Sequence, residues 1–155
     1  MSIDTTLELF CESLDQSLAL AETIGRNLRG GEVIELVSDI GGGKTTFVRG
    51  LAKGMGSNDR VSSPSFTLTN QYRSDTITMQ HFDFYRLHEP GIMRQELAEF
   101  VHDPSTVTVV EWAGIVDDVL PVDRLTINIT ATDDTSRKYD VVCPRSLQYV
   151  VEHLA

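Results

Sequence analysis

The sequence predicts an α/β fold: a three-layer sandwich with a mixed, largely parallel central sheet and a C-terminal antiparallel hairpin. The apolar run Val33–Val37 leads through a glycine-rich loop into a helical pattern, the strand–loop–helix order of a parallel α/β unit. Further strand-like runs end on acidic residues, and the last two strand-like runs are joined by a short polar turn. A length of 155 residues suits one domain, residues 1–155.

The first elements are a short strand and a capped helix. Residues Thr6–Phe10 alternate between polar and apolar side chains, which is typical of a strand. Ser13 can cap the following helix, and Gln16 lies at the spacing of a capping box. We expect Gly30-Gly31 to end this helix as a left-handed C-terminal cap.

The glycine-rich loop has the pattern of a phosphate-binding P-loop. Three glycines, Gly41, Gly42 and Gly43, allow backbone N–H groups to surround a polyphosphate at the positive end of a helix. Lys44 would reach the outer phosphates, and Thr45 would offer its hydroxyl to Mg²⁺. Ser38 stands where the pattern has its first glycine.

Two segments after the P-loop helix could complete a nucleotide site. Residues 61–66 are polar and contain Pro64, so this segment is either an ordinary turn or a loop that senses the terminal phosphate. Asp83 ends the strand-like run 76–83, and ligands of open α/β sheets gather at such strand ends. Asp83 therefore either lies beside Mg²⁺ or caps a turn.

A second acidic strand end follows. The apolar run Thr106–Val110 predicts an inner strand that ends on Glu111-Trp112, which makes Glu111 another candidate metal ligand. Trp112 either packs in the fold or contacts a ligand or partner. A helix-like pattern precedes this strand, and residues 87–123 contain eight acids against one base, Arg94. This stretch is either a solvated surface or a docking face for a basic partner.

The remaining sequence predicts a hairpin and a final helix. Strands at Leu125–Thr130 and Tyr139–Cys143 flank a turn at Asp133-Asp134. A short helix is expected over about 145–154. Arg137, at the start of the returning strand, is either a surface charge or a residue that reaches the nucleotide.

Composition limits the function classes. With 23 acidic and 13 basic residues the formal charge is −10, which argues against a broad electrostatic grip on nucleic acid. Cys11 and Cys143 belong to no metal or redox motif. The sequence shows no basic, apolar leader and no run long enough to span a membrane, so we expect a cytoplasmic protein with no membrane partner.

The chain resembles the TsaE family, small bacterial P-loop ATPases of tRNA threonylcarbamoyladenosine synthesis. Four blocks carry the resemblance in order: GGGKTTFVRGL at 41–51, SPSFTL at 63–68, HFDFYRL at 81–87, and EW at 111–112 with LP at 120–121. The chain departs from the family at Ser38 and Ser65, where glycine and threonine are usual.

The resemblance implies a set of site residues and partners. It places nucleotide phosphates on Gly41 to Thr46, Mg²⁺ on Thr45 and Glu111, and Asp83 near the reacting phosphate and the metal. It also places Arg137 at the nucleoside end of the ligand, with Asp15 and Ser17 nearby. Family members work with TsaB and TsaD, so tRNA would be met only through that complex.

The expected activity is Mg²⁺-dependent hydrolysis of ATP. Lys44 would neutralise developing charge, Thr45 and Glu111 would hold the metal, and Asp83 would help to place the water. Arg86 is a candidate arginine finger, and we expect slow turnover alone and faster turnover in the complex. The alternatives are a non-catalytic nucleotide switch and a small-molecule kinase with the same P-loop.

Overall fold

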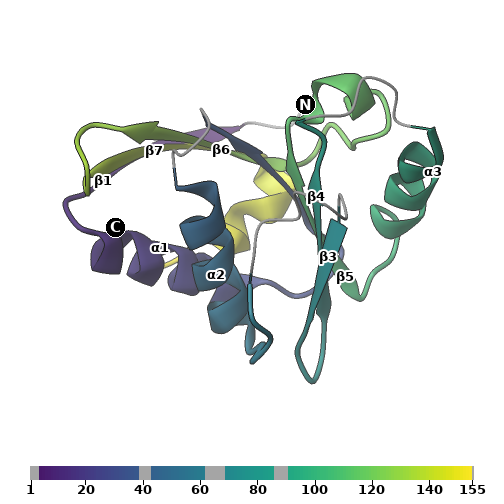
Figure 1. Ribbon diagram of the computed structural model, residues 1–155, viewed down its shortest axis with the longest axis horizontal. Helices are drawn as coiled ribbons and strands as arrows, with labels where there is room; N and C mark the ends of the chain where they lie inside the picture. The colour runs from purple at the N-terminus through teal and green to yellow at the C-terminus, as the bar shows by residue number, and fades with distance from the viewer. Residues whose placement is uncertain (1–3, 39–42, 62–68, 86–90, 155) are drawn as a thin grey trace.

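The computed structural model describes residues 4–38, 43–61, 69–85 and 91–154, and Figure 1 shows their arrangement. The described strands form one seven-stranded sheet in the order β1-β7-β6-β2-β5-β4-β3. The strands are β1 (Thr5–Cys11), β2 (Val33–Val37), β3 (Thr69–Arg73), β4 (Thr78–Asp83), β5 (Thr106–Glu111), β6 (Leu125–Ala131) and β7 (Arg137–Cys143).

The sheet is mixed and largely parallel. Strand β2 is parallel to both β5 and β6, and β4 is parallel to β5. Strand β7 runs antiparallel to its neighbours β6 and β1, and β3 runs antiparallel to β4. The predicted sheet and the predicted β6–β7 hairpin are therefore confirmed.

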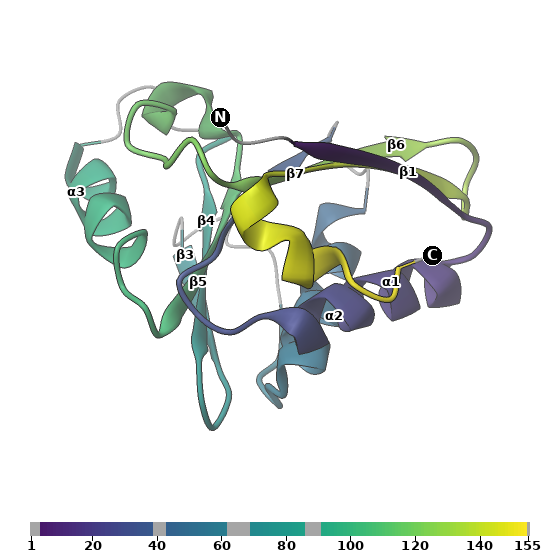
Figure 2. The ribbon, with the colours of Figure 1, turned by 180° about the vertical axis from the view of Figure 1, so that it is seen from behind.

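Helices cover both faces of the sheet. Helices α1 (Leu14–Asn27) and α2 (Lys44–Met55) lie on one face, and α3 (Gly91–Phe100) lies on the other (Figure 1). The 3₁₀ segment η1 (Ala113–Val116) packs on the α3 side, whereas η2 (Arg145–Val151) lies beside α1 (Figure 2). This arrangement gives the three predicted layers.

Alternation along the inner strands divides the apolar core between the two faces. In β2, Ile34 and Leu36 join the core under α1 and α2, whereas Val33 joins the core under α3. In β4, Met79 faces α2 and Phe82 faces α3. Side chains two residues apart share a face, so His81 and Asp83 lie on the α2 side with Met79.

Helices α1 and α2 approach each other closely through glycines. A Cβ atom on Gly50 would stand 2.5 Å from Cβ of Ala21, and one on Gly54 would stand 2.1 Å from the carbonyl oxygen of Glu22. No side chain could be placed at these two positions without moving α1. The glycines therefore fix the position of α2, which carries Lys44 at its first residue.

Both ends of α1 bear on the sequence predictions. Ser13 Oγ accepts a hydrogen bond from the Gln16 N–H at 3.1 Å, and Gln16 Oε1 accepts one from the Glu12 N–H at 2.7 Å. The predicted Ser13 cap is therefore confirmed. The predicted glycine cap is wrong: α1 ends at Asn27, and the extended residue Leu28 donates to the Gly25 carbonyl.

Gly30 serves a different contact. It has φ +105°, and a Cβ atom there would stand 2.3 Å from the Pro104 carbonyl oxygen, so this position meets the loop before β5. The expected final helix is also different, since residues 145–151 form a 3₁₀ segment with a kink at Leu147. Within the described residues, no helix is long and apolar enough to cross a bilayer.

Candidate nucleotide-binding site

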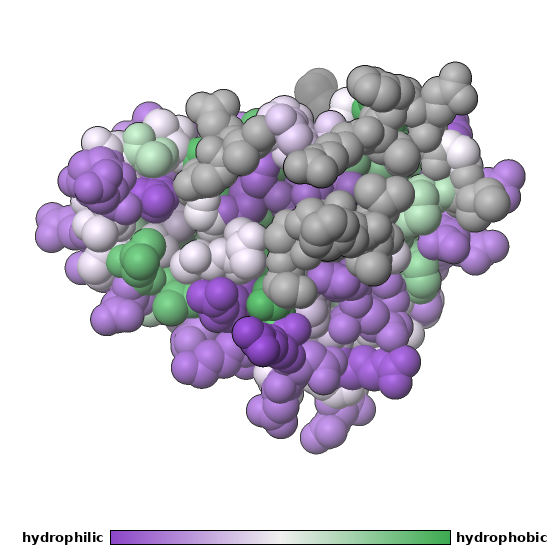
Figure 3. Space-filling view, viewed as in Figure 1, coloured by the Kyte–Doolittle hydropathy of each residue, from purple (hydrophilic) through white to green (hydrophobic). Residues whose placement is uncertain are grey.

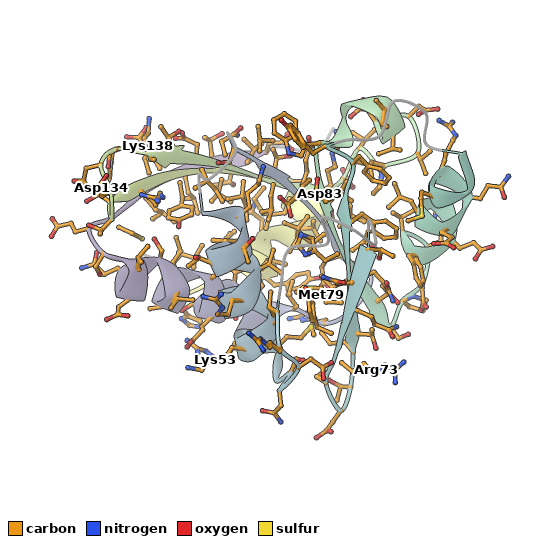
Figure 4. The ribbon with its side chains drawn as sticks, viewed as in Figure 1. Lys53, Arg73, Met79, Asp83, Asp134 and Lys138 are labelled. Carbon is orange, nitrogen blue, oxygen red and sulfur yellow. The ribbon has the colours of Figure 1, made fainter. Side chains whose placement is uncertain are left out.

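The carboxyl ends of β2, β5 and β4 meet at the edge of the sheet where α2 begins. Glu111 pairs in register with Leu36 of β2 and with Asp83 of β4, so the two predicted acids stand directly opposite each other. Figure 4 shows Asp83 at this end of β4 and Lys53 toward the far end of α2. Hydrophilic side chains gather over that far end and the β3–β4 turn (Figure 3).

Lys44 joins the helix to the acids. It is the first residue of α2, and Gly43 before it has φ +102°, a conformation that favours glycine. Its side chain is 9% exposed, with Nζ 3.6 Å from Glu111 Oε1, and Nζ donates to the Ser38 carbonyl oxygen at 3.3 Å. The ammonium therefore neutralises a buried carboxylate at the positive end of a helix.

The second oxygen of Glu111 has a different partner. Nε2 of His81, a fully buried residue of β4, is hydrogen-bonded to Glu111 Oε2. His81 was not among the residues to which the sequence assigned a role. Its position two residues before Asp83, on the same face of the strand, was the available signal.

Asp83 lies in an electrostatic environment unlike that of a surface aspartate. Burial and the negative charge of Glu111 raise the pKa of its carboxyl group. The Tyr85 N–H, which donates to Oδ1 at 3.0 Å, and the charge of Lys44 oppose this shift. Asp83 accepts the Tyr85 bond of a turn, as one of the two interpretations expected, and it also lies opposite Glu111 in register. A position beside Mg²⁺ stays a prediction.

Trp112 covers Lys44 from the outside. It adopts a left-handed backbone conformation, φ 57° and ψ 53°, directly after Glu111. Its ring centroid lies 4.6 Å from Lys44 Nζ and 4.8 Å from the ring centroid of Tyr85. Both aromatic side chains remain exposed. Trp112 therefore contacts a predicted site residue and is not part of the apolar core.

A cavity of about 200 Å³ opens beside Lys44. Arg124 braces its wall, because its guanidinium reaches Glu35 Oε1 at 2.9 Å and Asp117 Oδ1 at 2.5 Å. Sequence reasoning missed Glu35 and Arg124, which lie 89 residues apart. The cavity is lined by Glu35, Leu36, Val37, Ser38, Lys44, Trp112, Ala113 and Gly114.

Arg137, on β7, lies next to Gly43 of the glycine-rich loop. It is the first residue of β7 and pairs in register with Cys11 of β1. Its Nε lies 3.3 Å from the position that a Cβ on Gly43 would take. Its Nη1 donates to the carbonyl oxygens of Asp133 and Ser136 at 2.9 Å each, which hold the side chain in place.

The structure thus brings together Lys44, Asp83 and Glu111, and it places Arg137 beside Gly43. Thr45 and Thr46 lie in the first turn of α2 and are partly exposed. Ser17 is buried in α1, whereas Asp15 is exposed. Among the described residues, no three His, Cys, Asp or Glu side chains form a group that could hold a metal ion. Predictions for Gly41, Gly42, most of the segment 61–66, and Arg86 fall outside the described residues.

The fold and the site together define an α/β protein of P-loop-like type. The family model described as threonylcarbamoyl adenosine biosynthesis protein TsaE matches residues 11–139, which is most of the chain. The chain belongs to the TsaE family.

Individual relatives agree with this assignment. The chain is 32% identical over 138 residues to the tRNA threonylcarbamoyladenosine biosynthesis protein TsaE of Bacillus subtilis, covering 83% of this chain and 86% of the relative. It is 31% identical over 144 residues to the TsaE of Nostoc, covering 91% and 88%. The crystal structure of Bacillus subtilis YdiB superposes with a TM-score of 0.80 at 28% identity, covering 98% and 95% of the two chains.

Proposed function

We propose that this protein is a Mg²⁺-dependent ATPase that supports threonylcarbamoyladenosine modification of tRNA. The observation that carries the proposal is the buried pair of Lys44 and Glu111, at the junction of a glycine turn, a helix N-terminus and the carboxyl ends of three strands. The relatives supply the pathway, since their printed names place them in this biosynthesis.

The contact between Lys44 and Glu111 would be replaced by a contact between Lys44 and the phosphates when nucleotide binds. The Lys44 ammonium faces Glu111 and the Ser38 carbonyl oxygen. The phosphates of ATP carry more negative charge than one carboxylate, so the ammonium would turn toward them and release Glu111 Oε1. Arg137, next to Gly43, would add positive charge on the other side of the phosphates.

The side chains present suit Mg²⁺. The hydroxyl of Thr45 and the carboxylates of Asp83 and Glu111 are hard oxygen donors, the kind that this ion prefers, with phosphate oxygens and water completing its coordination. When bound, the ion would neutralise charge on the phosphates. Asp83, opposite Glu111 in register, would accept a hydrogen bond from the attacking water and orient it.

The cellular setting follows from the family. We propose that the protein acts in the cytoplasm on a complex of TsaB and TsaD type and meets tRNA only through it. A net charge of −10 suits docking on protein better than direct binding of tRNA. Turnover should be slow for the isolated chain, because a partner that supplies a transition-state arginine can be worth roughly 10³–10⁵ in rate.

Steady-state ATP hydrolysis tests the proposal. The chain and its Lys44→Ala variant are assayed alone and with TsaB and TsaD of the same organism. We expect stimulation by the partners, abolished by Lys44→Ala. Equal rates with and without partners would contradict partner dependence, and no hydrolysis under any condition would overturn the ATPase.

The two alternatives have their own signatures. An Asp83→Ala variant that binds ATP, hydrolyses none and still restores tRNA modification fully would show a nucleotide switch. A phosphorylated small-molecule product would show a kinase.

A further inference from the structure

We infer that His81 is a positioning residue, which fixes one oxygen of Glu111 so that the other faces the nucleotide. The inference rests on the proposed function, because that function gives Glu111 its role toward Mg²⁺. It adds a residue whose side chain, on the far side of the carboxylate from Lys44, would act only through Glu111.

The two oxygens of Glu111 are held from different elements. Lys44 Nζ, on α2, lies 3.6 Å from Oε1, whereas His81 Nε2, on β4, is hydrogen-bonded to Oε2. Only one of these contacts has to end when phosphates draw the ammonium away. The His81 bond would remain, so the released Oε1 keeps a fixed direction while it takes part in binding.

The His81 side chain lies in the buried interior of the fold. His81 is fully buried, pairs in register with Asn70 of β3 and Val109 of β5, and lies with its ring centroid 6.4 Å from that of Tyr72. Because a carboxylate oxygen accepts, Nε2 carries the hydrogen of this bond. Nδ1 has no hydrogen-bond partner among the described residues, so the bond to Glu111 is the ring's polar contact within that part of the chain.

Such a bond restricts the rotation of a carboxylate about its last torsion. Partners that orient a metal ligand are worth roughly 10- to 100-fold in metal affinity or activity. If His81 only filled space in the core, replacing it with an apolar side chain of similar size would leave metal affinity and activity unchanged. The two interpretations therefore differ in what a donor group at this position restores.

The test compares His81→Leu, which fills the space without a donor, with His81→Gln, which places an amide N–H₂ near the position of Nε2. Thermal unfolding of both variants establishes that they fold. For the two variants and the wild type, kcat and KM for ATP are measured with the TsaB and TsaD proteins. Calorimetry gives the affinity for ADP in Mg²⁺ and in EDTA.

We expect His81→Leu to lower kcat/KM for ATP by about 10- to 100-fold, with the affinity for ADP in EDTA nearly unchanged. It should also lose most of the gain in ADP affinity that Mg²⁺ gives the wild type. His81→Gln should keep most of the wild-type activity and most of the gain in ADP affinity that Mg²⁺ gives. The inference would be overturned if His81→Leu and His81→Gln lost activity and Mg²⁺-dependent ADP affinity equally. It would also be overturned if His81→Leu behaved like the wild type.

The two proposals fail separately. If the wild type hydrolyses no ATP, the ATPase is wrong, and the effect of Mg²⁺ on ADP binding then decides the role of His81. A gain that is present in the wild type and His81→Gln but absent from His81→Leu supports positioning. The same gain in all three proteins, or no gain in the wild type, rejects it.

Discussion

Lys44 Nζ and Glu111 Oε1 lie 3.6 Å apart, with 9% and 5% of the two side chains exposed. Removing one member of a buried ion pair leaves the other charge without compensation, at a cost of about 3–5 kcal/mol. We therefore expect Lys44→Met to lower the free energy of unfolding by this amount, and Lys44→Met/Glu111→Gln to recover much of it. Urea unfolding of the ligand-free proteins measures both. Equal midpoints for the single and double variants would contradict the expected recovery.

Arg124 should contribute more to the stability of the fold than Arg94 does. Arg124→Met removes charged hydrogen bonds to Glu35 and Asp117, and we expect it to lower the free energy of unfolding by about 1–3 kcal/mol. Arg94→Met is the matched control. Arg94 pairs with Asp118 at an exposed site, so its loss should lower the free energy of unfolding by clearly less than the loss of Arg124. Thermal and urea unfolding measure the stability of both variants. Similar losses of stability in Arg124→Met and Arg94→Met would contradict the role of Arg124 in bracing the cavity wall.

Gly54 offers a test in which packing opposes helix propensity. Alanine is favoured over glycine in a helix by about 1 kcal/mol, yet Gly54→Ala would drive its Cβ into the Glu22 carbonyl. We expect a net loss of about 1–3 kcal/mol from overpacking. Gly114→Ala, where a Cβ would meet nothing within 4 Å, serves as the control and should change stability by less than about 0.5 kcal/mol. Gly54→Ala would have to unfold at or above the wild-type midpoint to refute the close contact.

Cys143 predicts a dependence of stability on alkaline pH. Burial raises the pKa of its thiol from 9.0 to about 11. The native state therefore keeps a proton that the unfolded chain has lost, and this contribution, complete below about pH 9, disappears as the pH rises toward 11. The difference in unfolding free energy between the wild type and Cys143→Ala should narrow by about 2–3 kcal/mol over that range. A difference that stays constant from pH 8 to pH 11 would rule this out.

Local patterns were sufficient for much of the fold. The run before the P-loop, the acidic ends of β4 and β5, and the hairpin of β6 and β7 all appear where alternation and turn residues predicted them. Since parallel strands bring their carboxyl ends to one edge, the same reasoning located Asp83 and Glu111 close together.

Features set by distant parts of the chain were not predictable in this way. The glycine pair after α1 does not cap the helix, because Gly30 meets Pro104 from a loop far along the sequence. The partners of Glu111 and Glu35, namely His81 and Arg124, likewise depend on register between elements that no local pattern relates. The kink at Leu147 has no evident signal in the sequence either.

The pairing of β1 with β7 has a consequence for the order in which the protein is assembled. Thr5 lies opposite Cys143. Of the described strands, β1 is synthesised first, and its partner β7 is synthesised last. Until β7 emerges, β1 has no neighbour in the sheet, and its unpaired edge is the kind that invites wrong contacts between chains. The glycine turn and Lys44 are translated early, whereas Arg137 arrives with β7. A newborn chain would therefore possess Lys44 well before Arg137, and the side chain that lies next to Gly43 would arrive only with the last strand of the sheet.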